Sequence, residues 1–97
     1  MPTYIMLANW TDQGLKGIGE GSRRLDDVKK ILEDMGGHLQ ELFMTMGQYD
    51  LVGVYDAPDD AVAARFTLML GQLGNIRTTS MKAFPEAAFR QIVNSLH

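Results

Sequence analysis

Cysteine is absent from this 97-residue sequence. The chain therefore forms no disulfide, gives no thiolate ligand to a metal and has no cysteine nucleophile, which excludes several classes of enzyme. Histidine is also scarce, and the two histidines, His38 and His97, do not have the spacing of a metal-ligand motif. We expect neither a metal site nor a bound cofactor, and the lack of cysteine is compatible with a reducing compartment.

Positive charge is in slight deficit. Nine Lys and Arg residues stand against twelve Asp and Glu residues, which gives a net charge of -3. The basic pairs Arg23-Arg24 and Lys29-Lys30 have acids nearby. Nucleic acids and anionic membranes attract proteins through clustered positive charge, so neither is an expected partner.

Long hydrophobic runs are also missing. The N-terminal segment 1–10 is apolar, but it has no basic leader and Asp12 follows it closely. This pattern is typical of neither a signal peptide nor a membrane span, so we expect a soluble, cytoplasmic protein. The length and the apolar fraction of 45% fit one globular domain over residues 1–97.

Four segments rich in β-branched, aromatic and aliphatic residues predict strands. They are residues 3–10, 38–46, 49–55 and 75–84. Gly47 and Gln48 separate the second segment from the third, so these two strands should pair as an antiparallel hairpin with a tight turn. In the first three segments apolar residues fall on both faces, which indicates that both faces of the sheet are covered.

Helical patterns alternate with these strands. Residues 11–21 contain four glycines and predict only a short or frayed helix. From Ser22 an apolar stripe at helical spacing predicts a helix that stops at Gly36-Gly37. The acidic segment 56–60 predicts the start of a second helix, which runs to about Leu73 and is terminated by Gly74, and a last amphipathic helix occupies residues 85–97.

The predicted order is strand, helix, strand, strand, helix, strand, followed by the C-terminal helix 85–97. This order is typical of an α+β protein of the ferredoxin-like β-α-β-β-α-β type, with an antiparallel sheet and both helices on one face. The other face would then expose apolar side chains. We expect a second copy to cover it, so that two chains form a dimeric α/β barrel with the C-terminal helix as a further oligomer contact.

The Gly-Gln-Tyr-Asp sequence in the predicted hairpin can be interpreted as purely structural. Gly47 permits the positive φ of a tight turn, Tyr49 packs at the sheet edge, and Asp50 bonds to turn amides or to an arginine across the sheet. The alternative is that Tyr49 and Asp50 present a polar tip to a ligand. A second glycine-rich segment, residues 17–21, lacks the dinucleotide-binding spacing and contains Glu20, so it predicts a flexible crossover.

Short motifs are distributed over nearly the whole chain. They are Thr11-Asp12-Gln13-Gly14, Gly36-Gly37, Thr45-Met46-Gly47-Gln48-Tyr49-Asp50, Pro58-Asp59-Asp60 and Gly74-Asn75-Ile76-Arg77-Thr78-Thr79. In these motifs the chain resembles the GYD-domain family, whose name-giving triplet is present as Gly47, Tyr49 and Asp50. The resemblance implies a place in the dimeric α/β-barrel group, where some proteins are cofactor-free oxygenases or isomerases and others only bind small molecules. It carries no catalytic residue over to this chain.

Candidate ligand-binding residues are the polar and amphipathic side chains that the predicted strands could bring into one cleft. The set is Tyr4, Trp10, His38, Thr45, Tyr49, Asp50 and Arg77. A charged residue within a strand needs a counter-ion, a carbonyl or an anionic ligand, and Asp50 is a candidate partner for Arg77. His38 could meet Asp50 or Asp56, although a solvated histidine at a strand entry is the simpler interpretation. Aromatic residues in strands equally fit a core or an interface.

Three functions remain open at this level. The first is an oligomeric protein that binds a small, mainly apolar metabolite between sheet and helices or between subunits. The second is an enzyme without a cofactor, in which an arginine or a tyrosine polarises an oriented substrate. The third is an assembly protein without a pocket. A cavity lined by no acid, histidine or lysine would favour binding over catalysis.

Overall fold

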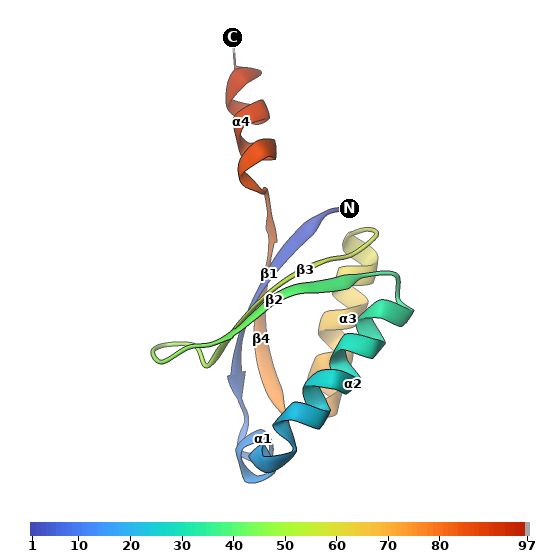
Figure 1. Cartoon of the computed structure of the whole chain (residues 1–97), viewed down its shortest axis with the longest axis vertical. Helices are drawn as coiled ribbons and strands as arrows, with labels where there is room; N and C mark the ends of the chain where they lie inside the picture. Colours follow the sequence, from blue (N-terminus) through green and yellow to red (C-terminus); the bar gives the residue numbers. More distant parts are fainter. Residues whose placement is uncertain (97) are drawn as a thin grey trace.

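A four-stranded sheet and two long helices form the body of the molecule in the computed structural model, which describes residues 1–96. The main elements are β1 (Thr3–Trp10), α2 (Gly21–Asp34), β2 (His38–Met44), β3 (Leu51–Asp56), α3 (Asp60–Leu73) and β4 (Ile76–Ala83). The strand order is β2-β3-β1-β4, and each neighbouring pair is antiparallel. This is the predicted ferredoxin-like β-α-β-β-α-β fold (Figure 1).

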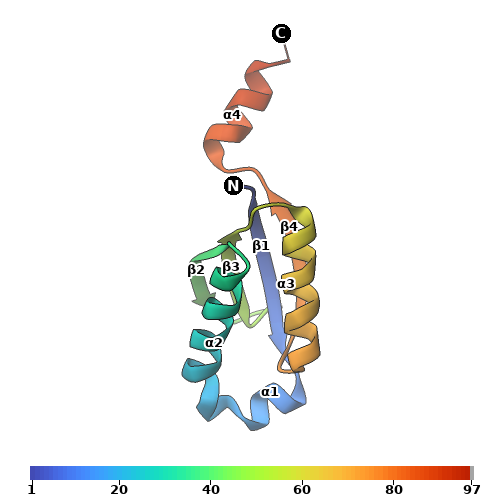
Figure 2. The same ribbon diagram turned by 90° about the vertical axis from the view of Figure 1, so that its right-hand side faces the viewer.

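Helices α2 and α3 cover the same face of the sheet (Figure 2). Alternate residues of β1 point toward them, because successive side chains of a strand face opposite sides. Tyr4, Met6 and Ala8 are therefore buried, while the residues between them are half-buried. The prediction that both helices lie on one face is confirmed.

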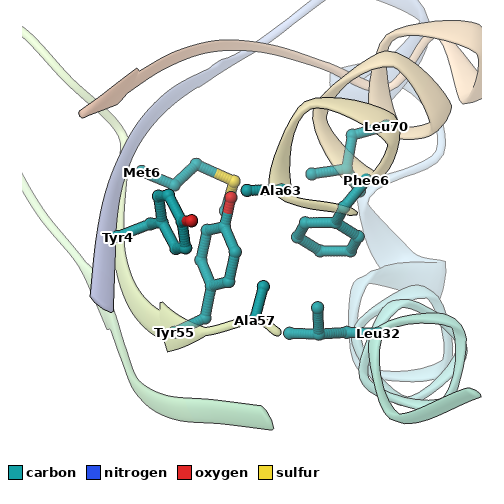
Figure 3. Close-up of a cluster of buried hydrophobic side chains, with 8 residues drawn as sticks. All are labelled: Tyr4, Met6, Leu32, Tyr55, Ala57, Ala63, Phe66 and Leu70. Atoms are coloured by element: carbon teal, nitrogen blue, oxygen red, sulfur yellow. The ribbon is translucent and has the colours of Figure 1, made fainter. Parts of the chain in front are cut away.

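The core is an aromatic cluster with aliphatic neighbours. The rings of Tyr4 and Tyr55 stack with centroids 5.3 Å apart, and Phe66 meets Tyr55 edge-on at 5.1 Å. Figure 3 shows the whole cluster, which consists of Tyr4, Met6, Leu32, Tyr55, Ala57, Ala63, Phe66 and Leu70. Each large buried side chain contributes about 1.5–3 kcal/mol to folding. The cluster holds α2 and α3 against the centre of the sheet.

The helix ends follow the local sequence signals. The carboxylate of Asp59 accepts a hydrogen bond from the Val62 amide at 2.9 Å, which satisfies a free donor at the start of α3. Gly74 ends α3 with a φ of 78°, and Gly36 follows α2 with a φ of 89°. Glycine adopts this left-handed conformation without the steric cost that a Cβ atom brings. The predicted stop signals of both helices are confirmed.

The glycine-rich segment between β1 and α2 forms two short pieces, α1 (Asp12–Lys16) and the 3-10 helix η1 (Ile18–Glu20). Thr11 caps α1 by accepting a hydrogen bond from the Gly14 amide at 3.1 Å. Gly14 lies against the carbonyl of Asn75 so closely that a Cβ atom would collide with it. The prediction of a short helix here is confirmed, and the close packing against Asn75 explains why residue 14 is a glycine.

The connection between β2 and β3 is longer than predicted. Residues 45–50 form a loop that the Thr45 amide closes by donating to the Asp50 carbonyl at 2.8 Å. Gly47 in this loop does not have a positive φ, because within residues 1–96 that conformation occurs only at Gly36 and Gly74. The predicted tight turn with a left-handed Gly47 is therefore wrong.

The reason lies in β1. The amide of Asp50 donates to the Ala8 carbonyl at 2.9 Å and to the Asn9 side chain at 3.1 Å. Asp50 is thus held both to β1 and, through its carbonyl, to Thr45, so the chain reverses over residues 46–49 and not over Gly47 and Gln48 alone. A pattern confined to the hairpin does not contain this information.

The second face of the sheet lies away from both helices (Figure 1). The strand register places apolar side chains of neighbouring strands opposite one another on this side. We call this surface the open face, and it consists of Ile5, Leu7, Phe43, Val52, Val54 and Met81. Phe43 is 53% exposed and Met81 is 44% exposed. In the described part of the chain no element covers the open face.

Helix α4 (Glu86–Asn94) follows Pro85 and projects from the end of β4, away from the sheet (Figures 1 and 2). Its apolar residues Phe89, Ile92 and Val93 are between 40% and 58% exposed. His97 belongs to the predicted C-terminal helix but lies outside the described residues. None of the helices described here is long and apolar enough to cross a membrane.

Candidate ligand-binding site

A cavity of about 670 Å³ lies between α2, α3 and the sheet, toward the end of the molecule that carries α1. Its walls are mainly aliphatic and aromatic. The apolar lining consists of Met6, Trp10, Leu25, Val28, Ile31, Leu32, Leu39, Leu42, Leu51, Phe66, Leu70, Leu73 and Ile76. The volume falls within the roughly 300–1,000 Å³ of typical small-molecule sites.

The cavity exists because the core does not fill the whole space under the helices. Leu32, Phe66 and Leu70 are at most 2% exposed and form its inner wall. Toward α1, Leu25 is only half-buried and Leu73 is 45% exposed, although both lie on the sides of their helices that border the cavity. Protein interiors are normally close-packed, so apolar side chains that surround an open space are available to a ligand.

Helix α1 is tied to the turn between α3 and β4 at this end. The Gln13 side-chain amide donates to the Leu73 carbonyl and to the Asn75 side chain, each at 3.0 Å. The Thr11 amide donates to the Asn75 carbonyl at 3.1 Å. These bonds hold Asn75, a polar group of the lining, in a fixed position.

Two neighbouring arginines of α2 lie at the cavity in different electrostatic surroundings. Arg23 bonds to Glu20 at 3.0 Å and lies 4.0 Å from Asp27, and these acids, Glu20 first, raise the pKa of its guanidinium. Arg24 instead donates from Nη1 to the Gly14 carbonyl at 3.2 Å. Within residues 1–96 it has no carboxylate within 4.0 Å. The positive charge of Arg24 is thus not neutralised by an ion pair.

Asp50 fixes the end of β1 at the cavity wall. Its carboxylate accepts a hydrogen bond from the Trp10 amide at 3.0 Å, while its own amide bonds to β1. Trp10 is the last residue of β1, and its side chain lines the cavity. The acid of the Gly-Gln-Tyr-Asp sequence therefore fixes the backbone of a cavity residue and does not bond to its own turn or to an arginine.

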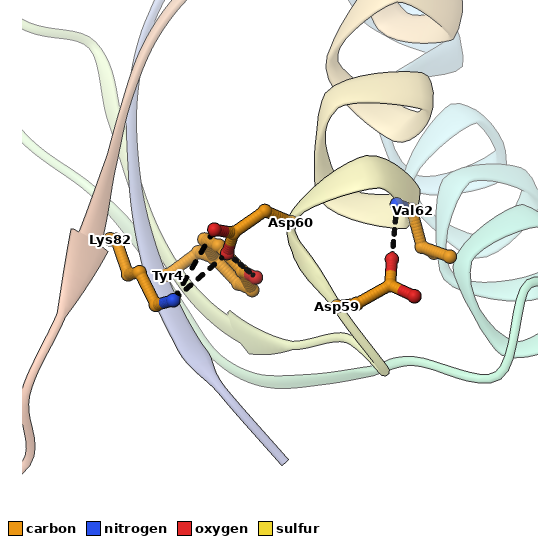
Figure 4. Close-up of polar contacts among 5 residues, drawn as sticks. All are labelled: Tyr4, Asp59, Asp60, Val62 and Lys82. Atoms are coloured by element: carbon orange, nitrogen blue, oxygen red, sulfur yellow. Dashed lines mark hydrogen bonds and ion pairs between the residues drawn. The ribbon is translucent and has the colours of Figure 1, made fainter.

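A separate polar cluster lies at the start of α3 (Figure 4). The Tyr4 hydroxyl donates to the Asp60 carboxylate at 2.6 Å, and Lys82 lies 3.1 Å from the same carboxylate. Burial, together with the Asp60 carboxylate, raises the pKa of Tyr4 to about 12. The bond from Tyr4, followed by that from Lys82, lowers the pKa of Asp60. The cluster ties β1 and β4 to α3 outside the cavity.

Tyr55 is fully buried beside this cluster, and its hydroxyl has no hydrogen bond of normal geometry. Burial raises the pKa of Tyr55, and the nearby Thr67 hydroxyl partly offsets the effect. The Thr67 proton itself goes to the Ala63 carbonyl at 2.9 Å. Tyr55 therefore contributes its aromatic ring to the core packing and does not line the cavity.

The structure does not bring the predicted ligand-binding residues together in one site. Trp10 lines the cavity and Tyr4 belongs to the core. Thr45, Tyr49 and Asp50 occupy the loop between β2 and β3, where the Thr45 hydroxyl bonds to the Tyr49 carbonyl.

The two remaining candidates lie on the side of the sheet that faces away from the helices. His38 is paired in register with Asp56, and Arg77 with Asn9. Over residues 1–96 no ion pair joins His38 or Arg77 to Asp50 or Asp56. The pairing suggested for Arg77 with Asp50 is not formed, because the Asp50 carboxylate bonds to the Trp10 amide.

Sequence reasoning missed the contribution of α2 to the site. Arg24 and Leu25 precede Val28 and Ile31 at helical spacing, so both extend the apolar stripe by one turn beyond the residues that pack against the core. An arginine at a position of such a stripe is the signal that could have identified the site. No group of three or more metal-ligating side chains occurs in the part of the chain described here.

Comparison with proteins of known sequence agrees with the resemblance noted above. Over 88 residues the chain is 35% identical to a protein of Thermus thermophilus named glutamine synthetase and cystathionine beta-lyase binding protein. The match covers 90% of this chain and 93% of that protein.

Two solved structures share the fold at low sequence identity. FFRP-DM1 superposes with a TM-score of 0.62 at 17% identity, over 87% of this chain and all of that one. The hypothetical protein PHS023 from Pyrococcus horikoshii gives a TM-score of 0.57 at 20% identity, over 89% of this chain and 93% of its own. The GYD domain model matches residues 4–93, so the chain belongs to the GYD domain family.

Proposed function

We propose that this protein binds a small, mainly apolar molecule in the cavity between α2, α3 and the sheet, and that it works as a homo-oligomer. The observation that carries the proposal is the cavity itself. Its volume of about 670 Å³ exceeds that of an ordinary packing defect, and its walls are formed largely by apolar side chains. Such walls release water and gain about 25 cal/mol for each Å² of apolar surface that a ligand covers.

Binding is favoured over catalysis by the position of the titratable groups. The lining does contain an acid and a lysine, contrary to the criterion stated for a pure binding site, but both Asp27 and Lys29 are exposed on α2. A general base must lie within hydrogen-bond reach of a bound substrate. An exposed group at the rim satisfies this requirement poorly, whereas a binding protein needs only the cavity.

The open face supports self-association through a second copy. Its centre is uncharged, while Glu41 and Asp56 lie toward one end of the strands on this side and Arg77 lies at the other. Two copies packed with their strands in opposite directions would bring opposite charges toward each other. This is the self-complementarity that a twofold interface requires.

Helix α4 would enlarge that interface. Four strands about 4.8 Å apart and about six residues long give a face of roughly 400 Å², while a specific interface buries about 800 Å² on each partner. The sheet alone is therefore too small. Because β4 leads directly into α4, the exposed side chains Phe89, Ile92 and Val93 are placed to pack on the same second copy.

A dye titration tests the cavity. Nile red, a neutral apolar dye, should bind the wild-type chain with increased fluorescence. Leu25→Trp fills the cavity and should weaken binding at least about tenfold, since a bulky ring occupies the space that the dye needs. The control is Leu68→Trp on the outer side of α3, where Leu68 is 72% exposed and does not line the cavity. Equal binding by all three proteins would refute the cavity as the site.

The name of the Thermus thermophilus relative favours a second function, the binding of other proteins. That relative is named for two enzymes, glutamine synthetase and cystathionine beta-lyase. Purified samples of these two enzymes from the host of this protein should then shift its sedimentation when mixed with it. Unchanged sedimentation of both enzymes would remove this candidate and leave the small-molecule proposal standing.

A further inference from the structure

We infer that the ligand of the cavity is an apolar carboxylic acid, with its carboxylate at Arg24 and its apolar part between the helices and the sheet. The inference rests on the proposed function, because it assigns a chemical class to the ligand of the same cavity. It depends on Arg24, the half-buried cation of the lining, since Arg23 is paired with acids and Lys29 is exposed on α2.

The charge balance distinguishes Arg24 from Arg23. Arg23 shares its charge with Glu20 and Asp27, and its side chain is 68% exposed. Asp27 is the one carboxylate found on the described lining, and it is the acid that faces Arg23. Arg24 is half-buried and bonds to a neutral carbonyl instead of a carboxylate. A partly buried charge without a counter-ion is costly, and an anionic ligand would relieve that cost.

The guanidinium of Arg24 is held in place. Its Nη1 donates to the Gly14 carbonyl at 3.2 Å, and it lies so close to Gly17 that a Cβ atom there would collide with it. Arginine carries five N–H donors in a planar fork, of which this bond uses one. The donors that remain match the two oxygens of a carboxylate, and their position costs little further ordering when a ligand binds.

The start of α2 adds to the positive potential at this end. Gly21 and Ser22 line the cavity, and the N-cap residue of this 14-residue helix, Glu20, makes no capping bond because its carboxylate bonds to Arg23. The N-terminus of a helix carries a partial positive charge that favours anions. Its contribution supports Arg24 and would not be sufficient alone.

Away from α2 the lining is almost entirely apolar. Its charged residues, Arg23, Arg24, Asp27 and Lys29, all belong to α2, and the side chains from β1, β2, β3 and α3 are apolar. A molecule that matches both regions therefore has one anionic end and an apolar body, as a medium-chain fatty acid has. A charge-assisted pair of hydrogen bonds should favour the acid over its neutral analogue by about tenfold or more.

Displacement of Nile red by octanoate, methyl octanoate and octanol tests this assignment on the full chain. In the wild type, octanoate should displace the dye at a concentration at least about tenfold lower than the two neutral compounds. Arg24→Gln should abolish this preference. Lys30→Gln is the control, because it removes one positive charge from an exposed position of α2 that does not line the cavity, and it should keep the preference.

The outcomes distinguish a failure of the acid assignment from a failure of the proposed function. If all three compounds displace the dye equally in the wild type, the cavity binds apolar molecules but the acid assignment is overturned. If Arg24→Gln keeps the preference for octanoate, Arg24 is not the anchor. If the dye does not bind the wild type at all, the proposed function itself fails. Should Arg24→Gln not fold, as judged by circular dichroism, the comparison of octanoate with methyl octanoate in the wild type decides the acid assignment.

Discussion

At the scale of single residues, Asp50 connects the hairpin loop to the cavity. Its carboxylate holds the Trp10 amide at 3.0 Å and its amide bonds to the Ala8 carbonyl at 2.9 Å. The sequence marks Asp50 as a turn residue, but its partners are about forty positions earlier in the chain. A local pattern could identify the residue and could not identify what it bonds to.

Replacement of this carboxylate should destabilise the protein. Asp50→Ala leaves the Trp10 amide without its acceptor, which should lower the free energy of unfolding by about 1–2 kcal/mol. Asp50→Asn retains an acceptor oxygen and should cost less. Urea denaturation measures both, with Asp26→Ala on the exposed side of α2 as the control. Equal stability of Asp50→Ala and the control would show that the bond contributes nothing.

Tyr4 gives the stability a dependence on alkaline pH. Its pKa is raised from 10.0 to about 12 in the folded chain, so the neutral hydroxyl is favoured by folding. This contribution is fully present below the unfolded pKa and is lost as the pH rises through that of the folded chain. Free energies of unfolding measured over this window should therefore fall with rising pH.

The variant Tyr4→Phe isolates that effect. It removes the bond to Asp60 and should cost about 1 kcal/mol at neutral pH. Its stability should fall less steeply than that of the wild type between pH 10 and about pH 12, because the titrating hydroxyl is absent. An identical slope in both proteins would contradict the assignment of this pH dependence to Tyr4.

At the scale of elements, the sequence predicts those helices and strands whose buried face follows from a regular spacing of apolar residues. The stripe of α2 and the alternating burial of β1 follow directly from the periods of helix and strand. The end of α3 follows from Gly74, because few residues adopt a φ of 78° without strain. The loop of residues 45–50 could not be predicted, since its last residue, Asp50, bonds to β1, which a pattern within the hairpin does not identify.

The two glycines at the end of α3 give opposite predictions. Gly74→Ala forces a Cβ atom into the left-handed conformation and should destabilise the protein by about 1 kcal/mol. Gly71 is helical, and a Cβ atom added to it would meet no other atom within 4 Å, so Gly71→Ala should stabilise by about 0.5–1 kcal/mol. Thermal denaturation of both variants measures the difference. The same sign of change in both would contradict the proposed role of Gly74.

The cavity is also a property of elements that sequence alone does not reveal. Leu25 continues the apolar stripe of α2, but whether it packs or borders an open space depends on the separation of α2 and α3. The same limit applies to Arg24, whose partner is the Gly14 carbonyl of another helix. Candidate residues could be ranked by chemistry, while their convergence required the fold.

At the scale of the whole molecule, the open face and α4 remain uncovered within one described chain. Val54 and Leu7 lie near the centre of the open face, in adjacent rows of its register. The double variant Leu7→Lys, Val54→Lys should separate a dimer into monomers, because it buries unpaired charge at the proposed contact. Light scattering measures the mass, and circular dichroism verifies the fold. A folded variant with the wild-type mass would exclude the open face as the contact.

We propose above that an oligomer of this chain binds an apolar molecule in the cavity of its subunits. Native mass spectrometry of the freshly purified full chain, with Nile red added, measures the assembly and its ligand together. We expect a dimer or a larger species that carries dye in proportion to its number of chains. An assembly without dye would contradict the binding site, and a monomer without dye would contradict both parts of the claim.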